Sequence, residues 1–401
     1  MKWEKVRLED CCYSISDGDH QPPPKAQQGI PFVTISNINS MNQLDFSDTM
    51  FVPKEYYQSL DEKRKVRKGD VLYSVVGSFG IPVLIKEERP FVFQRHIAIL
   101  RPKEDIVDSR FLFYTMLNRD FYAKADAVAV GAAQRTVSLG SLRNIKIDVP
   151  SLESQKHIAD ILSAYDDLIE NNQKQIKLLE EAAQRLYKEW FVDLRFPGHE
   201  NTKIVDGVPE GWNICPFSSK VDIMSGGTPK TSIPDYYNGR IPFYTPKDSD
   251  GAFFAYKTQI NITEGGLKNC NSRLYPPKTV IITARGTVGK TTILAVPMAM
   301  NQSCYALKMK ESDAPYYLFF ALNNEIKVLQ TMANGGVFNT IIGKTFDSIN
   351  IQIPKDPLIY GFEETVRPFM EQIKNKLQAN SKLVEARNRL LLKMMNGEVE
   401  V

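Results

Sequence analysis

A heptad pattern over residues 151–191, SLESQKHIADILSAYDDLIENNQKQIKLLEEAAQRLYKEWF, restricts the fold of this chain more than any other feature. Its apolar seam advances by alternating steps of four and three residues, through Ile158, Leu162, Tyr165, Ile169, Asn172, Ile176, Leu179, Ala183, Leu186 and Trp190. This spacing predicts a long helix that packs against another helix. Some 40 residues at about 1.5 Å each give a rod on the order of 60 Å. Asn172 within the seam is typical of a polar contact that fixes register.

A second helical stretch, residues 356–397, supplies the expected partner. Asp356 is suited to the N-cap, Pro357 to the first helical position and Gly397 to the stop. Its less regular seam runs through Phe362, Val366, Phe369, Ile373, Leu377, Val384, Leu391 and Met394. We therefore expect the two helices to pack together as an antiparallel coiled coil.

The sequence before each helix is an internal repeat. GIPFVTISN at Gly29 matches RIPFYTPKD at Arg240, VLYSVVGSFG at Val71 matches VIITARGTVG at Val280, and a helix predicted from RFLFYTMLNRDFYAKA at Arg110 matches YYLFFALNNEI. Short β-like runs broken by Gly and Pro predict an α+β fold with two tandem α/β globules, each followed by a long helix. The expected segments are a first globule at 1–150, a helical spacer at 151–191, a linker at 192–211, a second globule at 212–355 and a C-terminal spacer at 356–397.

Composition sets the class of protein and its compartment. The 401 residues carry a net charge of only +3, which permits nucleic-acid binding without arguing for it. Five cysteines, an odd number without CxxC spacing, indicate reduced thiols in a cytoplasmic protein. No apolar run approaches the ~18 residues of a membrane span.

ARGTVGKT, residues 284–291, resembles a phosphate-binding P-loop. A P-loop requires a helix to begin at its Lys-Thr pair, whereas the continuation TILAVPMAM is β-branched and is interrupted by Pro297. The first-half copy, GSFG at 77–80, has no lysine. A Gly-rich turn between strands is the favoured interpretation, and a P-loop NTPase using Lys290 and Thr291 is the alternative.

No catalytic or metal-binding pattern is found. The four histidines are scattered, none has metal-ligand spacing with cysteine or a carboxylate, and no GxSxG or HExxH occurs. We expect no catalytic residue, bound cofactor or metal in this chain. The basic run KRKVRK, residues 63–68, is most simply a solvated turn, with phosphate contact as the alternative.

Polar residues at the loop tips of both repeats are better functional candidates. Asn and Gln suit adenine, Arg and Lys suit guanine or phosphate, and Thr can contact the thymine methyl group. The candidates in the first half are Thr34, Ser36, Asn37, Ser78, Gln94, Arg95, Gln134, Arg135 and Thr136. Those in the second half are Thr228, Lys230, Thr245, Lys247, Asp248, Arg285, Thr287, Lys290, Asn301, Gln302, Asn339 and Thr340. An ordinary loop role is the alternative for each, but matched positions with different residues suggest one scaffold that reads two sequences.

The chain resembles the specificity subunit of type I restriction-modification systems over essentially its whole length. GIPFVTISNIN, and SGGTPK with RIPFYTPKD, are similar to the target-recognition signatures of that family. IDVPSLESQKHIADILSAYDDLIENNQKQIKLLEEAAQRLYKEWFVDLRFPGHE is similar to its central helical region. The second helix departs from the pattern, because it lacks the LYKEWF ending.

The resemblance implies a non-catalytic DNA-binding subunit. Each globule would be a target recognition domain for one part of an asymmetric, bipartite DNA sequence. The helices would be a spacer and the docking site for two methyltransferase subunits, which use S-adenosylmethionine to methylate adenine. Two ATP- and Mg-dependent restriction and translocase subunits would complete the complex, and this chain would hold no cofactor.

Two further expectations follow from the rod. Its length predicts half-sites separated by about one turn of B-DNA or less. Outer apolar residues such as Leu178 and Phe191 should be exposed without partners. The sequence is also compatible with a coiled-coil adaptor that does not recognise DNA, and with a specificity subunit of a related system that cuts near its site.

Overall fold

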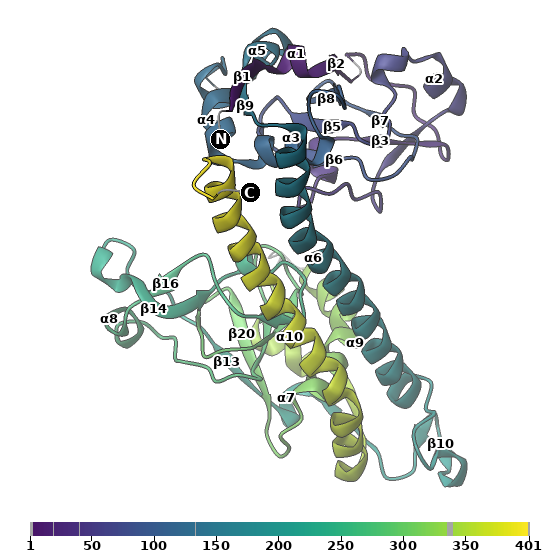
Figure 1. The fold of residues 1–401 in the computed structure, drawn as a ribbon. Coiled ribbons are helices and arrows are strands. Elements are labelled where there is room, and N and C mark those ends of the chain that lie inside the picture. Colours follow the sequence, from purple (N-terminus) through teal and green to yellow (C-terminus); the bar gives the residue numbers. More distant parts are fainter. Residues whose placement is uncertain (1–2, 19, 40, 133, 335–339, 400–401) are drawn as a thin grey trace. The chain divides into compact units, whose positions relative to one another are not determined.

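The computed structural model describes residues 3–18, 20–39, 41–132, 134–334 and 340–399. The chain divides into two compact units. The first unit contains residues 1–169 and 382–401, and the second contains 170–381. Each unit therefore combines one globule with part of each long helix (Figure 1). The candidate Asn339 lies outside the described residues.

The globule of the first unit contains a four-stranded antiparallel sheet in the order β2-β8-β5-β6, a smaller sheet β4-β3-β7, and the pair β1-β9. Its strands are β1 (Glu4–Arg7), β2 (Cys12–Asp17), β3 (Ile30–Val33), β4 (Met50–Val52), β5 (Val71–Ser74), β6 (Pro82–Leu84), β7 (Val92–Phe93), β8 (Ile97–Pro102) and β9 (Lys146–Val149). Its helices are α1 (Leu8–Cys11), α2 (Lys54–Ser59), α3 (Ser109–Leu117), α4 (Arg119–Ala127) and α5 (Leu139–Asn144). The single helix expected from Arg110 is thus two helices, which meet at Asn118.

The globule of the second unit repeats this topology. Its large sheet has the order β13-β20-β17-β18-β15, its small sheet is β16-β14-β19, and β12 pairs with β21. The strands are β12 (Asn213–Pro216), β13 (Val221–Ser225), β14 (Tyr237–Tyr244), β15 (Phe254–Ala255), β16 (Asn261–Ile262), β17 (Val280–Thr283), β18 (Thr291–Leu294), β19 (Ala299–Met300), β20 (Cys304–Met309) and β21 (Asn350–Ile353). The helices are α7 (Phe217–Lys220), α8 (Glu264–Lys268) and α9 (Pro315–Asn334).

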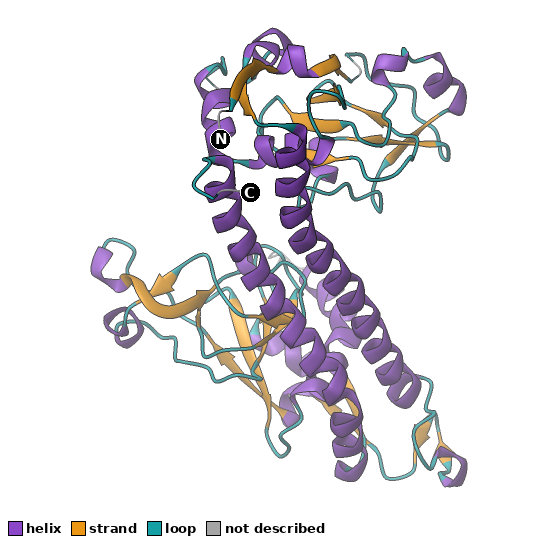
Figure 2. Ribbon diagram, viewed as in Figure 1, coloured by secondary structure: helices purple, strands orange, loops and turns teal. Residues whose placement is uncertain are grey.

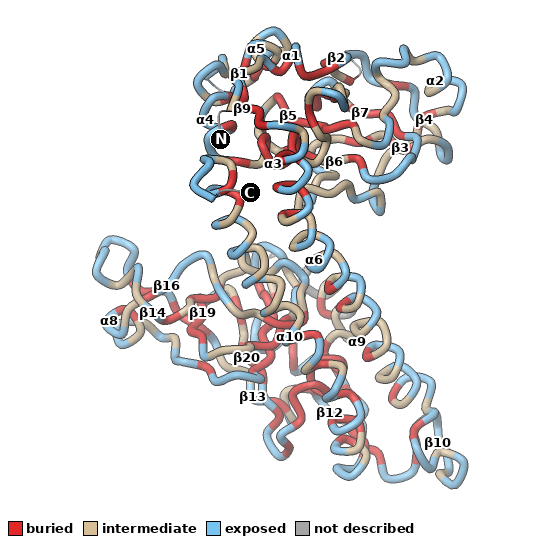
Figure 3. The backbone as a smooth tube through the Cα atoms, in the orientation of Figure 1, coloured by how far each residue is buried: buried red, intermediate tan, exposed pale blue. Residues whose placement is uncertain are grey.

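The two sheets of each globule correspond strand by strand. In the small sheets, β3 pairs in parallel with β7 as β14 does with β19. In the large sheets, β5 lies between β6 and β8 as β17 lies between β18 and β20. The central strands β5 and β17 are buried throughout. Figure 2 shows the strands of both globules, and Figure 3 shows that the segment at β5 is buried. The internal repeat is confirmed.

The long helices are α6 (Leu152–Tyr187), which continues through a π-helical turn at Lys188–Val192, and α10 (Asp356–Met395). They pack together. Within the second unit, the Asn172 side-chain amide donates to the Asn380 Oδ1 at 2.8 Å. Farther along, Tyr187 of α6 meets Phe362 of α10, with ring centroids 5.9 Å apart. The contacting residue on α10 changes from Asn380 to Phe362 as that on α6 changes from Asn172 to Tyr187. The two helices therefore run antiparallel. The coiled coil is confirmed.

The exposure expected for the outer face of α6 is half right. Leu178 is 65% exposed, but Phe191 is 7% exposed. Phe191 packs against Trp212 and Tyr317, with ring centroids 5.9 and 5.1 Å away. The expectation for Phe191 was wrong, because the π-helical turn directs this end of the helix into the core of the second globule.

A short hairpin of β10 (Ile204–Val205) and β11 (Val208–Pro209) lies in the linker between α6 and the second globule. No helix among the described residues has the length and apolarity needed to span a bilayer.

Candidate nucleic-acid interface

A Gly-rich turn connects β5 to β6 in the first globule. Gly77 and Gly80 have φ values of 71° and 96°, a conformation that favours glycine. The Ser74 hydroxyl, fully buried at the end of β5, donates to the Ser78 carbonyl at 2.9 Å and accepts from the Ile81 N–H at 2.9 Å. Ser78 is exposed at the tip. The buried hydroxyl thus holds the turn from inside the sheet.

The second globule builds the same turn between β17 and β18. The buried Thr283 hydroxyl donates to the Thr287 carbonyl and accepts from the Lys290 N–H at 3.0 Å. The Gly289 N–H donates to the Thr283 carbonyl at 2.9 Å, as the Gly80 N–H does to the Ser74 carbonyl at 3.0 Å. We call Ser74 and Thr283, with these bonds, the hydroxyl clamps.

This geometry is not that of a P-loop. Strand β18 starts at Thr291, where a P-loop would start a helix, and the Thr291 hydroxyl donates to Asn323 Oδ1 at 2.8 Å. A pocket of about 580 Å³ adjoins Lys290, but α6 lines it with residues of its C-terminal end, such as Tyr187, and α9 lines it with residues beyond its first turn, such as Phe320. No helix N-terminus among its described lining residues directs N–H groups into it, as phosphate binding would require. The P-loop alternative is therefore wrong.

A second loop lies beside the turn in the first globule. The Gly77 N–H donates to the Arg135 carbonyl at 3.0 Å, and the Gln134 amide lies close to Gly77. Gln134 and Arg135 are exposed. The Arg135 guanidinium pairs with the Asp126 carboxylate at 3.0 Å and donates to the Asp126 carbonyl, so part of its hydrogen-bonding capacity is used within the globule. The structure thus brings Ser78, Gln134 and Arg135 together.

The small sheet adds a third loop at the end of β3. Thr34 caps the 3-10 turn Ile35–Asn37, and its N–H donates to the Asn37 Oδ1 at 2.9 Å. The Asn37 amide also donates to the Asp48 carbonyl, so both ends of this amide are used within the loop. Ser36 is exposed. The Gln94 N–H donates to the Val33 carbonyl at 3.1 Å, which places Gln94 beside Thr34.

The second globule has the same neighbours with different side chains. Thr245 and Asp248 form the matching capping box, and the Asn301 N–H donates to the Tyr244 carbonyl at 3.0 Å. The Thr287 hydroxyl reaches the Pro246 carbonyl at 3.5 Å, which places the Gly-rich turn beside this capping box. The exposed candidates of this unit are Thr228, Lys230, Lys247, Arg285, Thr287, Lys290 and Gln302. Thr340 is half-buried and follows segment 335–339, which lies outside the described residues.

One loop of the first globule was missed from sequence. A Cβ at Gly18 would lie 2.0 Å from the Phe93 carbonyl oxygen, and one at Gly226 would lie 2.4 Å from that of Met300. The glycines therefore occupy matched places, each followed by an exposed loop. Thr228 and Lys230 were candidates from the second loop, and the Thr228 hydroxyl bonds to Gln302.

The loop after Gly18 carries His20 and Lys25, both exposed. His20 Nε2 lies 2.9 Å from an oxygen of Asp17. Nothing in DGDHQPPPK resembles GGTPK except the glycine and a proline-lysine pair. Only the matched contacts of the glycines identify the equivalence.

The segment around Asn271 was also missed. Its backbone lies against Gly227, and the Ser272 hydroxyl accepts from the Met300 N–H at 3.0 Å. This segment therefore borders the loop that carries Thr228 and the one that carries Asn301. Arg273 in the same segment is exposed.

The basic run 63–68 is partly neutralised. Lys65 and Arg67 pair with Glu62 at 2.8 and 3.1 Å. These side-chain bonds lower the pKa of Glu62, which therefore remains charged. The solvated-turn interpretation agrees with these contacts.

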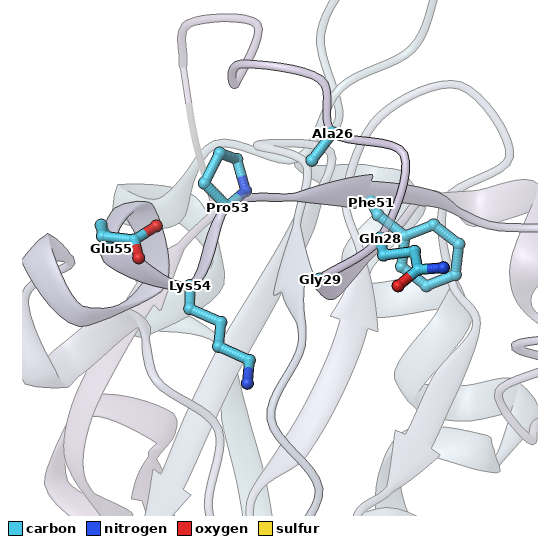
Figure 4. A pocket seen from close by; sticks show the side chains of 7 residues that line it. All are labelled: Ala26, Gln28, Gly29, Phe51, Pro53, Lys54 and Glu55. Atoms are coloured by element: carbon cyan, nitrogen blue, oxygen red, sulfur yellow. The ribbon is translucent and has the colours of Figure 1, made fainter.

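The pocket in Figure 4 lies at the other end of β3 from Thr34. It measures about 610 Å³ and lies between Ala26, Gly29, Phe51 and the start of α2 at Lys54. Its described lining residues include none of the candidate DNA contacts.

The described residues contain no cluster of three or more His, Cys, Asp or Glu side chains suited to a metal ion. All five cysteines are free thiols. Burial raises the pKa of Cys11 to about 11 and that of Cys12 to about 12, so both are protonated at neutral pH.

Comparison with known proteins identifies this architecture. The family model described as "Type I restriction modification DNA specificity domain" matches residues 1–181 and again residues 209–378. The chain belongs to this family. It is 24% identical to the type I restriction enzyme HindI specificity subunit of Haemophilus influenzae, with 99% of each chain covered. It is 25% identical to the putative MjaX specificity subunit of Methanocaldococcus jannaschii, covering all of this chain and 94% of that one.

The type I system S subunit from M. genitalium has a similar fold, with a TM-score of 0.61 at 15% identity over 98% of this chain and 96% of that one. As a specificity subunit, the chain recognises DNA within a restriction-modification complex. It is a non-catalytic component, and catalysis lies in the partner subunits.

Proposed function

We propose that this subunit reads an asymmetric, bipartite DNA target, one part with each globule, and directs adenine methylation and restriction by its partners. One observation carries the proposal. Both globules hold a Gly-rich turn with the same backbone hydrogen bonds but present Ser78 from one and Thr287 from the other. A duplicated scaffold with different exposed side chains suits two different half-sites, because base identity is read by side chains in the major groove.

Further support comes from the placement of the candidate residues within each unit. In the first, the turn at Ser78 adjoins Gln134, and Gln94 adjoins Thr34. In the second, Thr287 adjoins the capping box of Thr245. Amide, hydroxyl and guanidinium groups on neighbouring loops can share phosphate positioning and base contact.

Two exposed apolar residues of α6 and of the turn after it are candidate contacts for partner subunits. Leu178 and Val192 are 65% and 43% exposed, although both lie on or just beyond a helix whose seam is buried. A protein partner that covered them would remove apolar surface from water. We propose two methyltransferase subunits and two restriction and translocase subunits as partners, in a complex that acts in the cytoplasm. S-adenosylmethionine, ATP and Mg would be held by those partners.

Helix α6 spans 36 residues, or about 54 Å at 1.5 Å per residue. This length underlies the prediction that the half-sites are separated by about one turn of B-DNA or less. A contiguous recognition sequence would contradict that prediction.

Adenine methylation mapping tests the proposal. Genomic DNA from cells that express this chain with its cognate methyltransferase is compared with DNA from cells that lack this chain. We expect a two-part methylated motif that disappears without the chain. Exchange of residues 1–150 for those of a relative should change one half of the motif only.

Two other outcomes would contradict the proposal. An active methyltransferase that is unaffected by this chain would show that the chain does not direct methylation. A bound methyltransferase whose methylation pattern has no sequence preference would favour a coiled-coil adaptor.

A further inference from the structure

We propose that the hydroxyl clamps, Ser74 and Thr283, are positioning residues for sequence discrimination, each fixing the reading turn of one half-site. The proposal rests on the proposed function and extends it to residues that cannot touch DNA. Both side chains are fully buried. Their effect on recognition must therefore pass through the turn that they hold.

Each clamp hydroxyl both donates and accepts a hydrogen bond. The Ser74 hydroxyl donates to the Ser78 carbonyl and accepts from the Ile81 N–H, both at 2.9 Å. The Thr283 hydroxyl donates to the Thr287 carbonyl and accepts from the Lys290 N–H. The carbonyl thus held belongs to the exposed residue at the tip.

The strand ladder does not replace these bonds. The Ser74 N–H donates to the Ile81 carbonyl, and the Thr283 N–H donates to the Lys290 carbonyl, so the ladder closes at the base of the turn. The tip carbonyl of Ser78 lies beyond that base and is held by the hydroxyl. Removing the hydroxyl would leave a polar group near the core without its bond, and the turn would shift to recover one.

The clamp is independent of the side chains that the turn displays. Between their glycines, the first turn carries Ser78 and Phe79, and the second carries Thr287 and Val288. The same bonds hold both turns. The clamp therefore suits a scaffold in which the displayed residues change while the backbone position is retained, which is the requirement for reading two half-sites.

Substitutions in the whole subunit, expressed with its cognate methyltransferase, test the proposal. Thr283→Val removes the hydroxyl with little change in shape, and Thr283→Ser keeps it. Thr279→Val is the matched control, because the Thr279 hydroxyl is also buried but donates to the Pro276 carbonyl, at the opposite end of β17. Ser74→Ala is the equivalent change in the first unit.

The readout is the extent of methylation at the intact motif and at sites with one mismatch in either half. For Thr283→Val we expect discrimination to fall by about tenfold at positions of the second half only, the scale of a weakened recognition contact. Ser74→Ala should affect only the first half. Thr283→Ser and Thr279→Val should keep the wild-type pattern.

Several outcomes would overturn the proposal. If Thr283→Val matched Thr279→Val in both halves, the clamp would not position the turn. Equal loss in both halves with a lowered melting temperature, for Thr283→Val and Ser74→Ala alike, would show that the clamps have a structural role alone. If the wild-type chain writes no two-part motif, the proposed function fails first, which separates the two hypotheses.

Discussion

The two globules hold their Gly-rich turns in the same way but anchor the preceding strands with different chemistry. In the first, the Asp70 carboxylate before β5 is 1% exposed and takes two bonds from Arg101, each at 3.0 Å. At the matching place before β17, the Thr279 hydroxyl donates to the Pro276 carbonyl at 2.8 Å. The strand geometry is common to both, whereas the side chain that secures it is not. A buried carboxylate requires a cationic partner, whereas the Thr279 hydroxyl requires only a nearby backbone carbonyl.

The start of the helix after the large sheet shows the same contrast. In the first globule, Asp108 caps α3 with its own side chain, accepting from the Arg110 and Phe111 N–H groups. In the second, Ala314 precedes α9, and Glu363 of α10 accepts from the Tyr317 N–H at 2.7 Å. A cap that is local in one globule comes from the long helix in the other, so α9 depends on α10.

Removal of the charged anchor should have the largest effect. Asp70→Ala leaves the Arg101 guanidinium, only 16% exposed, without its carboxylate, and should destabilise the first unit by about 3–5 kcal/mol. Thr279→Ala should cost the second unit only about 1 kcal/mol. Amide hydrogen exchange of β5 and β8 measures the stability of the first unit within the intact chain, and exchange of β17 and β20 measures that of the second. Equal losses of protection in the two variants would contradict the comparison.

The Glu363 cap should make the stability of the second unit depend on pH. Burial, the largest cause, raises the pKa of Glu363 from 4.5 to about 7, so folding favours the protonated acid between these values. This contribution to stability is greatest below pH 4.5 and is lost as the pH rises towards 7. It amounts to at most on the order of 3 kcal/mol, at about 1.36 kcal/mol per pKa unit.

Glu363→Gln, which keeps an accepting oxygen but cannot ionise, isolates this contribution. The stability difference between wild type and variant should shift in favour of the variant from about pH 5 to about pH 8, as measured by exchange at the α9 amides. Burial also raises the pKa of Glu180 to about 7. Because Glu180 is present in both the wild type and the variant, its contribution cancels in the stability difference. A difference that does not depend on pH would refute the assignment.

Sequence patterns predicted the parts of the fold that follow from periodicity. The seam of α6 was placed correctly because Leu162 and Ala183, both fully buried, recur at heptad spacing. The Gly-rich turn at Gly286 was correctly predicted to connect two strands, because the residues after it are β-branched.

The contacts that organise the candidate interface had no such signal. Ser74 and Thr283 are single hydroxyls in apolar runs, and nothing in VLYS or VIIT shows that they hold a turn. The partner of Asp70 lies 31 residues away, and the burial of Phe191 depends on Trp212 and Tyr317. Such pairings are set by how distant segments pack, which a single sequence does not show.

The smallest expected effect concerns the side chains that flank each turn. Phe79 stacks on Tyr122 with ring centroids 5.4 Å apart, whereas at the matching position the Gln330 amide donates to the Val288 carbonyl at 3.1 Å. Tyr122→Ala should speed exchange of the Gly80 amide by several-fold, since an aromatic pair contributes about 1 kcal/mol. Tyr122→Phe keeps the ring and should have no effect.

The reciprocal change is Gln330→Ala, which should speed exchange of the Gly289 amide and leave that of Gly80 unchanged. Both amides donate to the strand residue that carries a hydroxyl clamp, so they report on the two turns in the same way. If Tyr122→Ala left the Gly80 amide fully protected, the stacked ring would be a passive neighbour. The Ser74 hydroxyl would then hold the turn of the first globule without a contribution from the stacked ring.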